Sequence, residues 1–186
     1  MMVSNLYHMK TITLIVLFCC VALISKAQDS SVEKSIFGIQ LGAVGVWAQN
    51  EFKLAKEFAF RTELGLRAGF GKNYYYLGPE ILIEPRWYYN LVRRDSKTKE
   101  ISNNSGNYIF LLTGFSPDWV IITNSDNLNA DNALFVIPSW GLKRNLGDRF
   151  NFEIGGGVGY SYSFVDFEHG EHDIVVNVHL RIGFKL

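Results

Sequence analysis

Residues 149–186 read RFNFEIGGGVGYSYSFVDFEHGEHDIVVNVHLRIGFKL, and two long segments of this stretch alternate apolar and polar side chains with a period of two. This period is typical of β-strands, in which successive side chains point to opposite faces. The even positions of the first segment are apolar: Phe150, Phe152, Ile154, Val158, Tyr160, Tyr162 and Phe164. The even positions of the second are also apolar: Ile174, Val176, Val178, Leu180, Ile182, Phe184 and Leu186. We therefore predict a β-hairpin with one continuous apolar face.

The length of these segments favours a membrane-spanning barrel over a soluble β-sandwich. Strands of soluble proteins usually have about 5–6 residues, whereas a tilted strand needs about 9–11 residues to cross a bilayer. Both segments are longer than ten residues. We predict an all-β fold, an up-and-down antiparallel transmembrane β-barrel, with lipid against the apolar face and polar side chains inside.

Residues 1–27 have the layout of a secretory signal peptide. Lys10 precedes an apolar run over residues 12–24, and a small residue, Ala27, precedes the expected cleavage point. The run has 13 residues, fewer than the roughly 20 that a membrane-spanning helix needs. Met1 and Met9 are both possible start residues. We expect one mature domain over residues 28–186.

The composition argues against a nucleic-acid partner and against a disulfide scaffold. Without Lys10 and Lys26, 16 basic residues stand against 18 acidic ones, a formal net charge of −2, and no basic footprint is present. Cys19 and Cys20 both lie in the apolar run, so the mature chain has no cysteine. We expect stability to come from barrel closure.

Alternation recurs along the rest of the mature chain, in residues 35–54, 57–70, 76–90, 108–115 and 133–144. With the C-terminal hairpin these segments give seven strands. Since bacterial single-chain barrels have an even number of strands, we predict eight. The eighth comes either from a division of residues 35–54 near Gly42–Gly45 or from residues 119–124.

The connections and the aromatic residues complete the predicted architecture. Residues 91–107 carry mixed charges without a period and predict a solvated loop. Trp47 shares odd positions with Phe37 and is expected on the apolar face. Trp87, Tyr88 and Tyr89 fit an aromatic girdle at the membrane interface.

The other face of the predicted strands collects charged residues of both signs. The basic ones are Arg61, Arg67, Arg86, Lys143, Arg149, Arg181 and Lys185, and the acidic ones are Glu63, Glu80, Glu84, Glu153 and Asp173. An eight-stranded lumen is just wide enough for side chains to fill, and unpaired charges there would be very costly. We therefore predict an internal ion-pair network and a filled lumen. Gly155, Gly157 and Gly159 share this face and would make room for long basic side chains.

An exported chain of this length that ends in an alternating strand with the terminal residues IGFKL resembles the small outer-membrane β-barrel proteins of Gram-negative bacteria, of the porin-like and opacity-protein type. The family commonly ends in an aromatic residue, whereas this chain ends in Leu186 with Phe184 two places earlier. The resemblance implies a location in the cell outer membrane, contact with its lipids and lipopolysaccharide, and insertion by the barrel-assembly machinery. It transfers no active-site residue.

Three alternatives remain beside this structural or adhesive barrel, which we expect to be a monomer without catalytic, cofactor or metal residues. The first is a lipid A deacylase or acyltransferase, for which His179 on the inward face would need a serine, with Ser139, Ser161 and Ser163 as candidates and Glu153 as the acid. The second is a soluble lipocalin-like carrier, because Gly45-Val46-Trp47 is similar to the G-x-W of lipocalins. The third is a divalent metal site in the loop over residues 166–173, which contains Asp166, Glu168, His169, Glu171, His172 and Asp173.

Overall fold

A computed structural model describes residues 30–125, 131–164 and 170–186 of the chain. The predicted signal peptide at residues 1–27 therefore lies outside the described residues. The strands are β1 (Ser35–Gly42), β2 (Gly45–Lys53), β3 (Phe58–Phe70), β4 (Tyr75–Trp87), β5 (Asn107–Ser116), β6 (Ile122–Thr123), β7 (Asn132–Leu146), β8 (Phe150–Phe164) and β9 (Gly170–Lys185). A short helix α2 (Leu91–Asp95) and a 3₁₀ turn η1 (Ser102–Asn104) separate β4 from β5.

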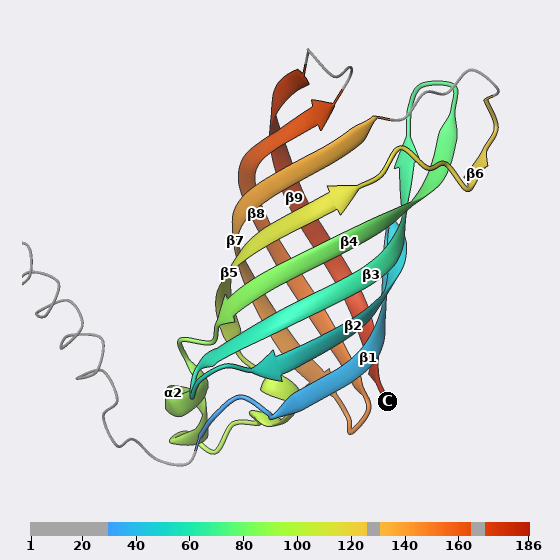
Figure 1. Cartoon of the computed structure of the whole chain (residues 1–186). Helices are drawn as coiled ribbons and strands as arrows, with labels where there is room; N and C mark the ends of the chain where they lie inside the picture. The colour runs from blue at the N-terminus through green and yellow to red at the C-terminus, as the bar shows by residue number, and fades with distance from the viewer. Residues whose placement is uncertain (1–29, 126–130, 165–169) are drawn as a thin grey trace, which may run out of the picture.

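Eight of these strands form a closed antiparallel ring (Figure 1). Each strand pairs with its neighbours in the ring, in the order β1, β2, β3, β4, β5, β7, β8 and β9, and β9 returns to β1. The prediction of an all-β, eight-stranded up-and-down barrel is confirmed. The eighth strand comes from the division of residues 35–54, because the chain turns between Gly42 and Gly45. The second candidate, residues 119–124, supplies only β6, which pairs with β4 at Tyr76 and Leu77 outside the ring.

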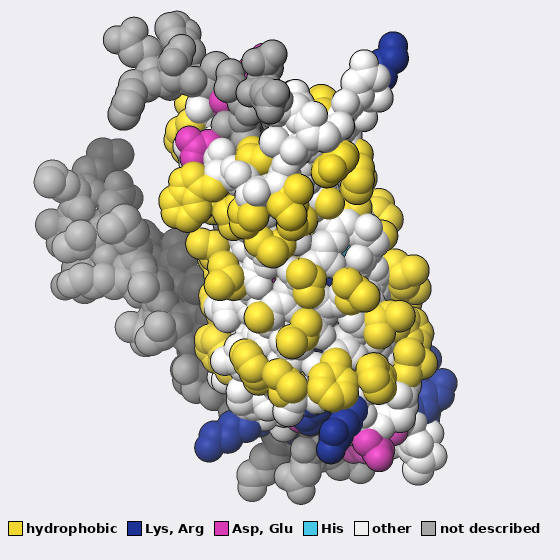
Figure 2. Space-filling model, turned by 90° about the vertical axis from the view of Figure 1, so that its right-hand side faces the viewer, with side chains coloured by type: hydrophobic (Ala, Val, Ile, Leu, Met, Phe, Trp, Pro, Cys, Tyr) yellow, Lys and Arg dark blue, Asp and Glu magenta, His cyan; other side chains and the backbone are white. Residues whose placement is uncertain are grey.

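The predicted parity of the strands is confirmed in β3, β8 and β9. Their even positions hold the outward side chains, of which Leu64, Val158 and Val178 are 62%, 57% and 79% exposed. Figure 2 shows apolar side chains over the height of one side of the barrel, with charged side chains at its two ends and most of them at the lower rim. Because all eight strands follow the alternation, the barrel has an apolar outer surface.

Two aromatic predictions were wrong. Trp47 points into the barrel and is 2% exposed, because the turn after Gly42 resets the parity of the chain between Phe37 and Trp47. Tyr88 is fully buried, whereas its neighbours Trp87 and Tyr89 are outside and 41% and 38% exposed. The alternation thus continues for two residues past the end of β4, and it divides the predicted girdle between the two faces.

One end of the barrel, which we call the closed end, carries α2, η1 and the last residues of β9 (Figure 1). The prediction of a solvated loop at residues 91–107 is wrong for part of this segment, since Leu91, Asn103 and Asn104 are buried. Asn103 and Asn104 adopt positive φ angles of 53° and 54°, a conformation that asparagine tolerates better than most residues. The backbone N–H of Glu33 donates to Asn104 Oδ1 at 2.7 Å. Residues 30–34 and 102–106 therefore close this end together.

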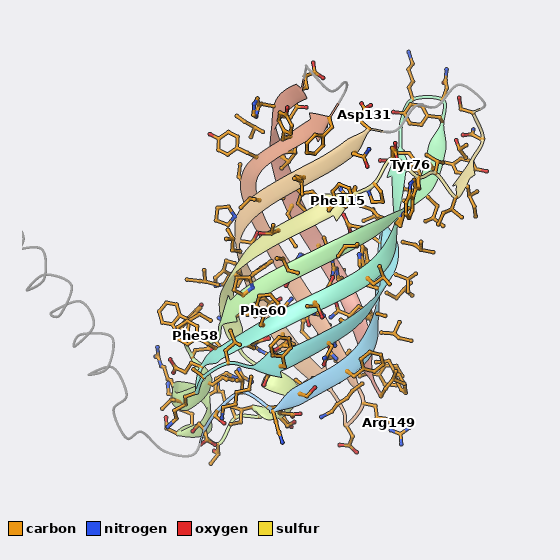
Figure 3. All side chains as sticks on the ribbon, viewed as in Figure 1. Phe58, Phe60, Tyr76, Phe115, Asp131 and Arg149 are labelled. Carbon is orange, nitrogen blue, oxygen red and sulfur yellow. The ribbon has the colours of Figure 1, made fainter. Side chains whose placement is uncertain are left out.

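We call the opposite end, with the β3–β4 turn and the start of β7, the cavity end. Tyr76, Phe115 and Asp131 lie there, whereas Phe58 and Arg149 lie toward the closed end (Figure 3). No helix in the described part of the chain is long and apolar enough to cross a membrane.

Candidate functional site

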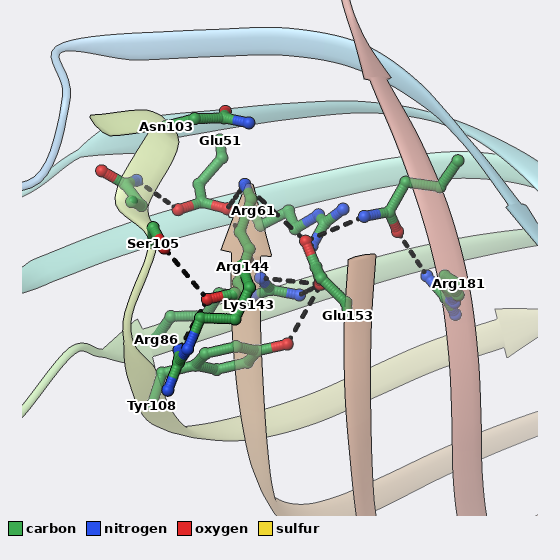
Figure 4. Close-up of polar contacts among 12 residues, drawn as sticks. Glu51, Arg61, Arg86, Asn103, Ser105, Tyr108, Lys143, Arg144, Glu153 and Arg181 are labelled. Atoms are coloured by element: carbon green, nitrogen blue, oxygen red, sulfur yellow. Dashed lines mark hydrogen bonds and ion pairs between the residues drawn. The ribbon is translucent and has the colours of Figure 1, made fainter. Parts of the chain in front are cut away.

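The closed half of the barrel holds a buried network of eight charged side chains. Its basic members are Arg61, Arg86, Lys143 and Arg181, and its acidic members are Glu51, Glu63, Glu84 and Glu153. These side chains are at most 8% exposed. They come from β2, β3, β4, β7, β8 and β9, which bring residues far apart in the sequence to one point on the barrel axis (Figure 4). Four positive and four negative charges balance, so the predicted internal ion-pair network is present.

Glu153, on β8, is the centre of this network. The Arg61 guanidinium donates to both carboxylate oxygens of Glu153 at 2.8 and 3.0 Å. Gln40 Nε2 donates to Glu153 Oε1 at 2.8 Å, and the Tyr108 hydroxyl donates to Oε2 at 3.0 Å. Arg86 adds a longer contact of 3.3 Å. One carboxylate therefore connects strands from all sides of the barrel.

Arg86 connects the centre of the network to the closed end. Its guanidinium bonds to Glu84, lies 3.4 Å from Glu51 Oε2, and stacks on the Tyr108 ring with Cζ 4.4 Å from the centroid. Glu51 also accepts a hydrogen bond from the Tyr88 hydroxyl at 2.8 Å and one from the Asn104 amide. The network is therefore continuous with the residues that close the barrel.

Arg181, on β9, forms the boundary of the network toward the cavity end. Its Nη1 donates to Glu63 at 2.6 Å and to Gln40 at 3.2 Å. Its guanidinium carbon lies 4.0 Å from the centroid of the Trp47 ring, the geometry of a cation–π contact. The Trp47 indole N–H in turn donates to Glu80 at 3.0 Å. Arg181 and Trp47 therefore separate the network from a cavity in the other half of the barrel, and they form the floor of that cavity.

Several charged groups in the network are held by proximity more than by aligned hydrogen bonds. Lys143 Nζ lies 3.8 Å from Glu51 and 3.7 Å from Glu153, and it has no aligned hydrogen-bond partner among the described residues. Arg61 Nε is 2.8 Å from Glu63 Oε1, also without alignment. Removal of one member from such a buried set leaves an uncompensated charge, which is strongly destabilising. The network therefore fills the closed half of the lumen and connects the surrounding strands rigidly.

Five of the predicted interior charges do not belong to this network: Arg67, Glu80, Lys185, Arg149 and Asp173. Arg67 pairs with Glu80 at 3.1 Å, and its side chain is 52% exposed toward the cavity end. Lys185 pairs with Glu33 at 2.8 Å at the closed rim. Arg149 and Asp173 were wrongly predicted to be inside: both are exposed, since Arg149 lies beside the β7–β8 turn and Asp173 lies near the tip of β9.

The predicted sites for catalysis and metal binding are not assembled by the described residues. His179 packs at Gly155, with its ring 6.0 Å from that of Phe110, and its Nδ1 lies 3.3 Å from the Asn177 amide. No described serine makes a hydrogen bond to His179, and the Ser139 hydroxyl donates instead to its own strand at Ile137. Of the metal candidates, Asp166, Glu168 and His169 lie outside the described residues, and the described residues contain no cluster of three His, Cys, Asp or Glu side chains.

The glycines on β8 were predicted to make room for long basic side chains from opposite strands, and at Gly155 the space is taken instead by His179. A Cβ atom at Gly155 would lie 2.6 Å from the His179 ring. At Gly159 a Cβ atom would lie 2.1 Å from the Val136 carbonyl oxygen of the neighbouring strand. Gly159 therefore permits the close approach of β8 to β7.

The cavity half of the barrel contains a space of about 710 Å³. Apolar side chains from β4, β5 and β7 form one wall: Leu82, Leu112, Phe135 and Ile137. Polar side chains line the rest of the cavity. They are Asn177, His179 and Arg181 on β9 and the Arg67–Glu80 pair, which joins β3 to the β4 residues nearer the cavity end. Sequence reasoning missed this cavity, because it predicted polar side chains along the whole lumen. The available signal was that residues 108–115 are apolar on both faces.

Comparisons of this chain with protein-family models, with curated proteins and with solved structures found no match.

Proposed function

We propose that this chain is an integral outer-membrane β-barrel with a structural, adhesive or envelope-interaction role, and that it does not act as a diffusion pore. The observation that carries the proposal is the distribution of side chains across the wall. Outward residues such as Leu64 and Val178 are apolar and 62% and 79% exposed, whereas Arg61 and Glu153 inside are at most 1% exposed. A soluble carrier of the lipocalin type would need a polar outer surface, so this distribution favours the membrane.

Aromatic side chains at the closed rim support the same proposal. Phe58 stacks on Trp87 with centroids 6.1 Å apart, and Trp87 meets Tyr89 edge-on at 6.0 Å. The Trp140 indole N–H donates to the Tyr89 hydroxyl at 2.9 Å. Such amphipathic rings are enriched at the interface of membrane barrels. In this proposal the closed end faces the periplasm, and the outward side chains contact outer-membrane lipid and lipopolysaccharide.

The proposed absence of conduction follows from the buried network. Glu153 and its partners occupy the barrel axis, and Leu91, Asn103 and Asn104 cover the closed end. An ion would have to displace a charge-balanced cluster to pass, which is costly. The proposal therefore combines a membrane barrel with a sealed periplasmic half.

Four measurements test this proposal. The protein should fractionate with the outer membrane, resist extraction by carbonate, and migrate differently before and after boiling in gel electrophoresis. In planar bilayers the inserted protein should show no steady conductance. Release by salt or carbonate would rule out an integral barrel, and a stable ohmic channel would rule out the sealed lumen.

A further inference from the structure

The barrel wall has eight strands at the closed end and six at the cavity end. β1 and β2 stop at the turn between Gly42 and Gly45, whereas β9 continues beyond that level. Only residues Arg181–Lys185 of β9 pair with β1. On the far side of the missing strands, β3 pairs with β2 only as far as Arg67. A gap therefore lies between β9 and the β3–β4 hairpin above the β1–β2 turn.

The backbone of β9 presents an unpaired edge to this gap. Alternate residues of an antiparallel strand bond to its two neighbours, and the N–H of Leu186 donates to Phe37 on β1 at 3.0 Å. The even residues of β9 thus turn toward β1. At Ile174, Val176 and Val178 the N–H and C=O groups point into the gap, and no described strand pairs with them there.

The cavity opens sideways into the gap. Its lining includes the whole run of β9 from residue 174 to residue 181, with both inward and outward positions. Both faces of one strand can border a single space only at the free edge of that strand. The turn residues Ala43 and Val44 lie below the opening, and Arg67 and Tyr76 lie across from β9. The gap is therefore a side opening of the cavity.

The side opening lies at the height of the apolar outer surface. The outward residues beside it on β9 are apolar, with Val176 and Val178 65% and 79% exposed. Unpaired backbone at membrane depth is tolerated only where it borders a cavity or is buried in protein. A lipid chain that leaves the membrane at this point would meet apolar side chains first and hydrogen-bonding groups next.

The lining of the cavity is amphipathic. Leu82, Leu112 and Phe135 offer an apolar wall. Arg67 lines the cavity with its side chain 52% exposed, and Arg181 lies on the floor with its side chain 8% exposed. The volume of about 710 Å³ falls within the range of about 300–1,000 Å³ typical of small-molecule sites. An apolar wall and an accessible guanidinium fit a ligand with one chain and one accepting head group.

We propose that the cavity binds a single-chain amphiphile, such as a long-chain carboxylic acid, which enters from the membrane through the side opening between β9 and the β3–β4 hairpin. The chain lies against the Leu112 and Phe135 wall, and the head group accepts hydrogen bonds from Arg67, near the floor that Arg181 forms. This inference rests on the proposed membrane location of the barrel. A second, bulkier lipid chain would remain outside.

Contact quenching of Trp47 tests the proposal, because this indole lies on the floor and is 2% exposed. The protein carries Trp87→Phe, Trp119→Phe and Trp140→Phe so that only Trp47 fluoresces, and it is inserted into phosphatidylcholine vesicles. Dibromostearic acid is then titrated. We expect quenching that saturates with the acid and is absent with a two-chain brominated phosphatidylcholine.

Matched valine variants separate the cavity from the lipid outside. Val175 is half-buried and lines the cavity, whereas Val158 on β8 points outward, is 57% exposed and does not line the cavity. Val175→Phe should weaken the saturable quenching by about tenfold or more, since the added ring takes up ligand space, and Val158→Phe should leave it unchanged. Ser161→Leu, a second substitution in the lining, should act as Val175→Phe does.

Two results would overturn the proposal. One is quenching that rises linearly with the acid and never saturates in the protein without lining substitutions. The other is equal quenching in the Val175→Phe, Ser161→Leu and Val158→Phe proteins. Heat-dependent gel migration and carbonate resistance are measured on the same samples. If these two properties are lost, the membrane proposal fails. If they are retained without saturable quenching, the ligand proposal alone fails.

Discussion

Substitution of Glu153 by Gln should destabilise the barrel strongly, because it removes the central negative charge of the buried network. The carboxylate lies within 2.8 Å of Arg61, 3.3 Å of Arg86 and 3.7 Å of Lys143. After the substitution, four buried cations face three carboxylates. Breaking a buried ion pair by removing one partner costs about 3–5 kcal/mol. We expect the free energy of unfolding to fall by an amount in this range.

Urea unfolding of the vesicle-inserted protein measures this effect under conditions where unfolding and refolding curves coincide. Glu171→Gln is the matched control, since Glu171 is exposed near the tip of β9, and surface substitutions usually change stability by about 0.5 kcal/mol or less. The double variant Glu153→Gln with Lys143→Met removes one charge of each sign. It should be less destabilised than the sum of the two single variants, because residues in one network couple. If the Glu153→Gln protein unfolds at the same urea concentration as the Glu171→Gln protein, the network does not stabilise the barrel.

Three further substitutions test other parts of the structure. Val158→Arg, at an outward position near the middle of β8, should cost about 2–4 kcal/mol if lipid surrounds the barrel, and a cost near zero in the same urea assay would argue against lipid there. Gly65→Ala brings a Cβ atom to 2.1 Å from the Trp47 ring and should lower the free energy of unfolding by about 1–3 kcal/mol. In a Trp47→Leu background the same substitution should cost much less, and an equal cost in both backgrounds would show that the clash lies elsewhere. Asn104→Ala removes an acceptor for the Glu33 N–H and a donor to Glu51. The free energy of unfolding should fall by about 1–3 kcal/mol, and proteolysis at the closed end should become faster. An unchanged digestion pattern would contradict the role of Asn104 in closing this end.

The division of the strands into an outward apolar face and an inward polar face was predictable because alternation over a long strand specifies two faces. Phe58 through Phe70, and both arms of the C-terminal hairpin, have the predicted parity. Charge balance then predicted the ion-pair network, since buried charges require partners. These conclusions needed only residue types and spacing.

The rest depended on contacts that alternation does not encode. Residues 108–115 are apolar on both faces, and only the ring closure shows that Phe110 and Leu112 point inward. The turn at Gly42 changed the face of Trp47, because a turn resets parity. Asn103 and Asn104 lie in a polar segment, yet they are buried as hydrogen-bonding partners of Glu33 and Glu51. Composition alone cannot distinguish a polar plug from a polar loop.

The short contact between the first and last strands has a consequence for how the barrel folds. Gly38 pairs with Lys185, near the two ends of the barrel sequence, and this junction has five residue pairs, whereas β8 and β9 share fifteen. Because contacts between distant parts of a chain form slowly, we expect ring closure to follow the formation of the local hairpins. Until closure, the nascent sheet would expose the unpaired edges of β1 and β9. A factor that shields those two edges would accelerate biogenesis, and amide exchange in the finished barrel should be fastest beside this junction.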